Sequence, residues 1–152
     1  MSADPSSIFF TLFNEVGIIN QLSSNRFDQR LPAGLRVSQF GVLNHLVRVG
    51  DGKTPVSLAN AFQLTKGAMT NTLSILQEKG LVSIKQNPND GRSKLVFITD
   101  AGRETREQAI RDLAKEFAFV AEQIDTEQVL AVIPILQQIR MVLDRHRKPS
   151  LE

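Results

Sequence analysis

The segment spanning residues 63–99 places the strongest constraint on the fold of this 152-residue chain. Met69 and Leu73 lie about one helical turn apart in an apolar pattern that stops before a glycine, so a short amphipathic helix is expected over 65–78. Thr65 supplies the side-chain oxygen with which such helices commonly begin. The helix has one apolar side and one polar side, and the residues that follow it decide which fold it belongs to.

Two strands are expected directly after this helix. Residues 81–85 and 94–98 are rich in β-branched and apolar side chains, and the turn-forming residues 87–93 connect them. A short helix followed by a β-hairpin with a polar tip is typical of a winged helix-turn-helix, a domain that binds DNA. Charge supports this assignment, because residues 53–103 contain seven Lys or Arg against three Asp or Glu, whereas the whole chain carries only +2.

Further helices are expected on both sides of this central segment. Their predicted starts are Asp4-Pro5, Ser38, Thr54-Pro55 and Asp125-Thr126. One long helix is expected from residue 99 or 100 to residue 124, with an apolar stripe that contains Ile110, Leu113, Phe117, Val120 and Ile124. Between residues 8 and 19 the first helix is apolar on more than one side, so a second element or a second subunit must cover it.

These patterns predict a mainly helical α+β protein. We expect a winged helix-turn-helix DNA-binding domain at residues 36–103 and a helical dimerisation region formed by residues 1–35 and 104–150. The apolar surfaces of the outer helices are too broad for one small domain to cover, which predicts a homodimer. Leu151-Glu152 is given no structural role, since a vector-derived tag remnant accounts for it equally well.

Short polar side chains on the exposed side of helix 65–78 can reach base edges in a major groove. Asn71 is the best candidate for direct base contact, because its amide can both donate to and accept from adenine. On the hairpin, Arg92 suits a narrow minor groove, and we expect Asp90 to hold it through a bidentate ion pair. A simpler interpretation is that all these side chains merely face solvent. The DNA-binding candidates are Thr65, Lys66, Thr70, Asn71, Ser74, Lys85, Asp90, Arg92, Ser93 and Lys94.

The chain resembles the MarR family of winged-helix transcriptional regulators, named for multiple antibiotic resistance. The resemblance rests on Leu76-Gln-Glu-Lys-Gly80-Leu-Val, on Asn87-Pro-Asn-Asp90-Gly-Arg92 and on Phe97-Ile-Thr99-Asp-Ala-Gly102. The flanking helices match the family in order and length, so the resemblance covers essentially the whole chain.

The resemblance implies a homodimer whose first and last helices interlock and which binds a pseudo-palindromic operator in double-stranded DNA. It also implies release by small, commonly aromatic, anionic ligands. Residues 65–77 correspond to the recognition helix, Asp90 and Arg92 to the wing motif, and Ser57 to a position near the phosphate backbone. Three positions depart from the family pattern, because Gly91 replaces a basic residue and Asn71 and Lys85 stand where Arg is common. We expect Gly91 and Asn71 to lower phosphate affinity and to change the preferred operator. Lys85 keeps the positive charge but loses the guanidinium fork.

The composition argues against several other functions. Cys is absent, which excludes disulfides, thiolate metal sites, cysteine nucleophiles and thiol-based sensing. Only His45 and His146 are present, whereas a closed zinc site needs about four N, S or O ligands. No Gly-rich phosphate loop is visible, so we expect no enzyme activity, no cofactor and no metal. The N-terminus lacks a secretory signal and no apolar run approaches ~18 residues, which predicts a cytoplasmic protein without a membrane partner.

A regulator also needs a signal that controls it. With thiol-based sensing excluded and zinc sensing disfavoured, the remaining candidate is a small-molecule effector that binds in a cleft between the DNA-binding domain and the dimerisation helices. The side chains that could line such a cleft are Phe13, Phe40, His45 and Phe117. Each is more often a plain core residue, so none is assigned as a ligand contact. The alternative function is a winged helix that binds another protein without DNA, which would be favoured if Lys66, Arg92 and Lys94 were dispensable.

Overall fold

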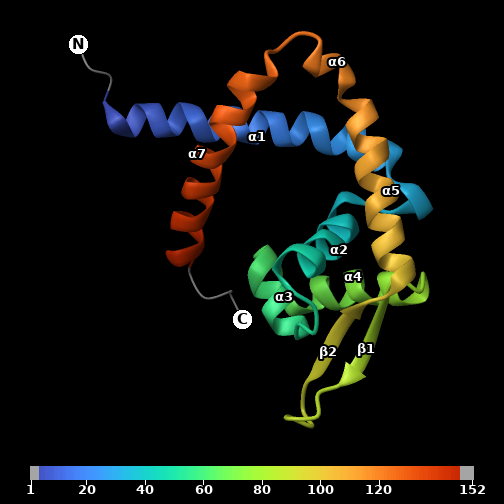
Figure 1. Cartoon of the computed structure of the whole chain (residues 1–152). Coiled ribbons are helices and arrows are strands. Elements are labelled where there is room, and N and C mark those ends of the chain that lie inside the picture. The colour runs from blue at the N-terminus through green and yellow to red at the C-terminus, as the bar shows by residue number, and fades with distance from the viewer. Residues whose placement is uncertain (1–3, 148–152) are drawn as a thin grey trace.

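The structure is a computed structural model that describes residues 4–147. The elements in chain order are α1 (Pro5–Arg30), the 3-10 helix η1 (Pro32–Gly34), α2 (Val37–Val49), α3 (Pro55–Phe62), α4 (Lys66–Glu78), β1 (Val82–Gln86), β2 (Lys94–Ile98), α5 (Asp100–Glu116), α6 (Ala118–Ala121) and α7 (Thr126–Arg145). Figure 1 shows α2, α3 and α4 gathered above the β1–β2 hairpin, with α1 and α6 at the other end of the molecule and α7 running back from there to the level of α3. The predicted mainly helical α+β fold is confirmed. Leu151-Glu152, the predicted tag remnant, lies outside the described residues.

The hydrophobic core lies among α2, α3, α4 and the inner face of the hairpin. Its largest fully buried side chains are Leu35, Val42, Leu43, Leu46, Leu58, Met69, Leu73, Leu76 and Val96. On α4 the buried apolar residues Met69, Leu73 and Leu76 follow one another at intervals of four and three, which is the helical period that the sequence shows. This burial fixes which side of α4 faces outward.

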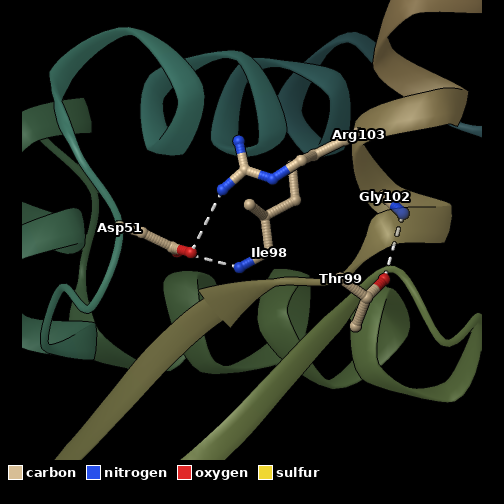
Figure 2. A network of polar contacts seen from close by, with 5 residues as sticks. All are labelled: Asp51, Ile98, Thr99, Gly102 and Arg103. Atoms are coloured by element: carbon tan, nitrogen blue, oxygen red, sulfur yellow. Dashed lines mark hydrogen bonds and ion pairs between the residues drawn. The ribbon is translucent and has the colours of Figure 1, made fainter.

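The predicted side-chain caps of α3 and α4 are present, and so is the predicted cap of α7, where Asp125 Oδ1 accepts from the backbone N–H of Glu127 at 3.0 Å. Helix α5 also has a side-chain cap, which was not predicted from the sequence. Thr54 Oγ1 accepts a hydrogen bond from the backbone N–H of Ser57 at 3.1 Å, and Thr65 Oγ1 accepts from Ala68 at 3.2 Å. Thr99 Oγ1 accepts from Gly102 N at 3.0 Å and begins α5 (Figure 2). These caps satisfy first-turn N–H groups that have no partner within the helix.

Two other predicted caps are wrong. Helix α2 begins at Val37 rather than after Ser38, because Asp28 of α1 accepts from the backbone N–H of Val37 at 2.7 Å. The helix start is therefore fixed by a carboxylate nine residues earlier in the chain rather than by a local hydroxyl. Asp4 is the N-cap of α1, but its side chain makes no capping hydrogen bond; its backbone carbonyl accepts from the Ser7 hydroxyl at 2.8 Å.

The predicted long helix ending at residue 124 is also wrong. Helix α5 ends at Glu116 because Phe117 leaves the helical region, with φ −101° and ψ 7°. The Phe117 ring packs edge-on against Phe27 of α1 at 5.1 Å, and Arg26 and Arg30 of α1 pair with the Glu116 carboxylate at 3.0 Å and 2.9 Å. These contacts with α1 favour a bend, after which the chain forms α6 and turns back along α7 (Figure 1). Of the predicted stripe, Ile110 and Ile124 are exposed, whereas Leu113 is buried together with Ala109.

The hairpin joins the helical core through one face and one edge. Strands β1 and β2 pair antiparallel in the register Val82↔Ile98 to Gln86↔Lys94, and β1 begins one residue later than predicted. Successive side chains alternate between faces, and the buried set contains Val82, Val96 and Ile98. Along the edge of β2 that faces away from β1, Val96 N donates to the carbonyl of Lys53 at 2.8 Å, which connects the hairpin to the loop before α3.

Gly102 allows α5 to start directly against the hairpin. A methyl group at this position would lie 2.1 Å from the carbonyl oxygen of Leu81 and 2.8 Å from Cγ1 of Ile98. Neither atom can move freely, since one belongs to the backbone and the other to a nearly buried side chain. Only glycine therefore fits this crossing of the helix and the first strand.

We expect Gly102→Ala to lower the free energy of unfolding by at least about 2 kcal/mol, because the added Cβ overpacks a contact with backbone. Urea denaturation followed by circular dichroism measures the change. Gly67→Ala is the matched control, since a Cβ there has nothing within 4 Å and alanine favours the helix. Equal stability of the two variants would contradict the close approach of α5 to β1.

Candidate DNA-binding surface and adjoining cleft

The exposed side of α4 carries the four polar residues that the sequence assigned to it. Lys66, Thr70, Asn71 and Ser74 are all exposed, while the opposite side of the helix is buried in the core. The Thr70 hydroxyl donates to the carbonyl of Lys66 at 2.8 Å, so its remaining capacity is as an acceptor. Within residues 4–147, the side chains of Lys66, Asn71 and Ser74 form no hydrogen bond, which leaves them available to an external partner.

The start of α4 is sterically open. A Cβ at Gly67 would meet nothing within 4 Å, so another molecule can approach the helix backbone closely at this point. Thr65 contributes to the helix start rather than offering a free hydroxyl acceptor, since its Oγ1 already accepts from Ala68 N. Ser57 lies in the first turn of α3, where its exposed hydroxyl donates to the carbonyl of Thr54 at 2.8 Å.

A groove of about 330 Å³ separates α4 from the hairpin. Its lining residues are Pro55, Thr70, Leu73, Ser74, Gln77, Ile84 and Lys94. The groove brings three predicted DNA contacts from α4 and β2 together, with an apolar floor and a polar rim. Sequence analysis missed Gln77 as part of this surface, although its place three residues after Ser74 on the same helix side was a usable signal.

Lys85 lies on the other face of the hairpin from this groove. It pairs with Leu95 in the register, whereas Lys94 pairs with Gln86, and adjacent positions on a strand point to opposite faces. The Lys85 ammonium lies 5.5 Å from the centroid of the Phe97 ring, a cation–π contact on the outer face. The structure therefore does not bring Lys85 together with the α4 residues.

The tip of the wing is closed by its own hydrogen bonds. Asn87 Oδ1 accepts from the backbone N–H of Asn89 at 3.0 Å, and the carbonyl of Ser93 accepts from Asn87 N at 3.1 Å. The Ser93 hydroxyl accepts from Asn87 Nδ2 at 2.9 Å, so this side chain serves the loop itself. These contacts give the seven-residue connection between the strands a defined shape.

The predicted ion pair between Asp90 and Arg92 is wrong. Asp90 Oδ1 instead accepts from the backbone N–H of Arg92 at 3.0 Å, a local turn in which the carboxylate holds the main chain. Across the part of the chain that the structure describes, the exposed Arg92 guanidinium makes no ion pair. A carboxylate two residues away satisfies the backbone with less ordering of side chains than a bidentate pair requires. The charge of Arg92 is thus left available for a partner outside the chain.

A second, larger cleft of about 750 Å³ lies on the other side of the helix-turn-helix. Its lining residues are Leu12, Phe13, Val16, His45, Arg48, Val49, Ala61, Gln63, Leu136, Ile139, Arg140, Leu143, Asp144 and Arg147. Of the four predicted candidates, Phe13 and His45 line the cleft. Phe40 packs against the hydrophobic core and Phe117 packs on Phe27, so both of these are structural.

Three arginines face the cleft, which the sequence gave no local reason to group. Arg48 comes from the end of α2, and Arg140 and Arg147 come from α7 and the residues after it. Arg147 Nη1 donates to the carbonyl of Asn60 at 2.7 Å, and its other terminal nitrogen pairs with Asp144. The cleft therefore combines an apolar wall with an excess of positive charge.

His45 is held neutral by its position in this cleft. Burial lowers its pKa below the ordinary value of 6.5, and the positive charges of Arg48, Lys53 and Arg147 lower the pKa further. Its ring lies 5.4 Å from the Phe62 ring, centroid to centroid. A neutral imidazole at neutral pH can accept a hydrogen bond through one nitrogen and donate through the other.

Nowhere in residues 4–147 do three or more His, Asp or Glu side chains gather as a metal ion would require. None of the described helices is both long enough and apolar enough to cross a membrane.

Comparison with known proteins decides the family. A model of the MarR family matches residues 33–93, which contain the helix-turn-helix and most of the wing. The multiple antibiotic resistance protein MarR of Escherichia coli (strain K12) is 34% identical over 105 residues, covering 64% of this chain and 72% of that protein. The chain belongs to the MarR family of transcriptional regulators.

Solved structures share the fold of this chain. The transcriptional regulator BldR from Sulfolobus solfataricus superposes with a TM-score of 0.76 at 24% identity, covering 94% of this chain and 99% of BldR, which shows the shared fold. A mutant MarR from E. coli complexed with operator DNA superposes with a TM-score of 0.69 at 25% identity, covering 90% of this chain and 99% of that one.

The lowered pKa of His45 predicts how stability depends on pH. In the unfolded chain the imidazole takes up a proton near pH 6.5, whereas in the folded protein it stays neutral to lower pH. The unfolded state therefore binds more protons in this window, and the free energy of unfolding falls as the pH falls below about 6.5. We expect His45→Gln to show a smaller loss than the wild type between about pH 7.5 and about pH 5.5 in urea denaturation.

The matched control is Gln123→Ala, at an exposed residue without a titratable group, which should keep the wild-type pH dependence. If His45→Gln and the wild type lost the same free energy of unfolding over this range, the burial of a neutral imidazole would be refuted.

Proposed function

We propose that this MarR-family protein regulates transcription by binding a pseudo-palindromic operator in double-stranded DNA as a homodimer. The observation that carries the proposal is the pairing of an exposed polar α4 surface with an available Arg92 guanidinium on the adjacent hairpin. The similarity to a mutant MarR solved with operator DNA supports the same use of this surface. The alternative, a winged helix that binds only protein, has no observation in its favour.

In this proposal α4 lies in the major groove and Asn71 contacts a base edge, because its amide offers a donor and an acceptor together. Lys66, at the start of α4, and Lys94, which lines the groove between α4 and the hairpin, contact phosphates. Arg92 extends from the wing tip towards a narrow minor groove or the neighbouring backbone. Two such surfaces about 34 Å apart in a symmetric dimer match successive major grooves on one side of B-DNA.

The proposed dimerisation region consists of residues 1–35 and 104–150, and the DNA-binding domain of residues 36–103. Helices α1 and α7 bury no residue within the described single chain, although both are rich in large apolar side chains. Phe10 is 73% exposed, Leu22 64% and Leu130 60%. Apolar surface of this extent on two adjacent helices fits an obligate interface with a second copy, because such contacts are hydrophobic like a domain core.

We further propose that the larger cleft receives a small effector that carries a negative charge and an aromatic ring. The apolar wall from α1 and α7 suits a ring, and Arg48 and Arg140 suit a carboxylate or similar anion. The cleft touches α1, α7 and the turn before α4, so an occupant would contact both the proposed dimerisation region and the helix-turn-helix. Differential affinity for two arrangements of these parts would link the effector to DNA binding.

We expect DNA binding to weaken steeply with salt, because phosphate contacts release condensed counterions. Arg92→Ala should weaken binding to all duplexes and reduce the slope of log affinity against log salt by about 1. A fluorescence titration against a duplex enriched by the wild-type protein from a random-sequence pool, repeated over several salt concentrations, measures both effects. A flat salt response of the wild type would refute docking dominated by phosphates.

Asn71→Ala is the matched comparison, since it removes a base contact rather than a charge. It should change the preferred base at one position of each half-site, at a cost of about 1–3 kcal/mol, and leave the salt slope unchanged. Selection of duplexes by both proteins tests this, and identical preferred sequences would remove Asn71 from base recognition.

The homodimer has its own test. We expect a mass of about twice 16.9 kDa in solution at micromolar concentration, and Leu130→Glu in α7 should shift the protein towards the monomer mass, because burying a carboxylate in an apolar interface is unfavourable. Val56→Glu, which replaces an exposed apolar side chain on α3, is the control and should remain dimeric. A wild-type mass near 16.9 kDa by light scattering would contradict the dimer.

A further inference from the structure

Strand β2 is hydrogen-bonded along both edges. On the edge away from β1, the last backbone N–H of the strand donates to a side chain. One edge pairs with β1. On the other edge, Val96 N donates to the carbonyl of Lys53 at 2.8 Å and the Val96 carbonyl accepts from Gly52 N at 3.0 Å. The next N–H along this edge belongs to Ile98, and it donates to Asp51 Oδ1 at 2.8 Å (Figure 2). The carboxylate thus takes the place that a backbone carbonyl would have in a longer third strand.

The two oxygens of Asp51 make contacts of different strength. Oδ1 receives a short, charge-assisted hydrogen bond from the backbone of Ile98, a residue that is only 7% exposed. Oδ2 lies 3.5 Å from Nη2 of Arg103, whose side chain is 48% exposed, while that of Asp51 is 29% exposed. Solvent screens the ion pair, so the bond to the strand is the more important of the two.

The position of this bond matters because it lies at the base of the hairpin. Arg92 is six residues before Ile98, and at about 3.3 Å per residue the strand and loop between them reach up to roughly 20 Å. A tilt of only about 10° at the base would therefore move the tip by about 3 Å, comparable to the rise between base pairs in DNA. A small loss of order beside Ile98 is amplified at Arg92.

We propose that Asp51 is a positioning residue for the wing, which fixes the base of β2 and thereby sets where Arg92 lies relative to α4. The inference rests on the proposed DNA-binding function. Asp51 lies in the loop between α2 and α3, and its side-chain partners, Ile98 and Arg103, are outside the predicted DNA-contact set. Its effect on DNA is therefore transmitted through the strand rather than by contact.

A double-mutant cycle between Asp51 and Arg92 tests the proposal. The probe is a single duplex enriched by the wild-type protein from a random-sequence DNA pool. Affinities are measured for the wild type, Asp51→Ala, Arg92→Ala and the double variant at one salt concentration. Thermal unfolding and mass in solution are recorded for each variant, so that loss of folding or of the dimer is seen separately from loss of binding.

We expect Arg92→Ala to weaken binding roughly tenfold in the wild-type background but less than about twofold in the Asp51→Ala background. In the Asp51→Ala background the guanidinium is misplaced and already contributes little to DNA affinity. A purely structural role of Asp51 would lower stability and leave the Arg92 effect unchanged. Equal fold-changes in the two backgrounds would therefore overturn the inference. An Arg92→Ala variant that binds DNA like the wild type would also overturn the inference. Arg92 would then make no contribution to affinity that depends on its position.

Conservative variants separate the two contacts of Asp51. Asp51→Asn keeps an oxygen that accepts from Ile98 N and should retain the full Arg92 effect, and Arg103→Gln should retain it as well. If Asp51→Ala does not fold, the same cycle is run with Asp51→Glu, whose longer side chain displaces the acceptor without removing the charge. Additive effects in that cycle would overturn the inference equally. If the wild type itself shows no salt-dependent DNA binding, the proposed function fails before the cycle begins.

Discussion

Burial of Met69, Leu73 and Leu76 fixes the rotation of α4 about its own axis, and the whole proposed DNA-binding surface depends on that rotation. Side chains three and four residues apart share one side of a helix, so burying these three leaves Asn71 and Ser74 on the exposed side. Turning the helix outward would expose large apolar side chains at a cost of about 1.5–3 kcal/mol each. The burial of the apolar side of α4 in the core therefore also fixes the orientation of its polar side.

The wing follows from the same core but adds its own restraints. Its inner face packs on the helices through residues such as Val96, while its tip is shaped by hydrogen bonds within the loop. Asp90 stabilises the turn through the main chain, so the Arg92 guanidinium stays available to an outside partner. The glycine at position 102 brings α5 against the base of the hairpin and connects the DNA-binding domain to the outer helices. The exposed side of α4 and the wing tip that carries Arg92 thus belong to a single packed unit.

The outer helices show the opposite balance of burial and exposure. Helices α1 and α7 bury nothing within the described chain, yet they present a broad apolar surface, as the sequence of residues 8–19 had already indicated. Between these helices and the helix-turn-helix lies the cleft lined by Arg48 and Arg140. A change in how α1 and α7 pack would therefore reach the cleft and α3 directly, which is the physical requirement for coupling an effector to DNA binding.

The sequence by itself determined the order of the elements, the polar side of α4 and the caps at Thr54 and Thr65, because these signals arise between residues at most four positions apart. Only the tertiary structure decided where α2 begins, where α5 bends and which residues gather around the cleft. Asp28 sets the start of α2, contacts with α1 favour the bend at Phe117, and Asp51 completes the edge of a strand 47 residues away in the sequence. Such contacts depend on how distant segments pack, and no local pattern in the sequence records them.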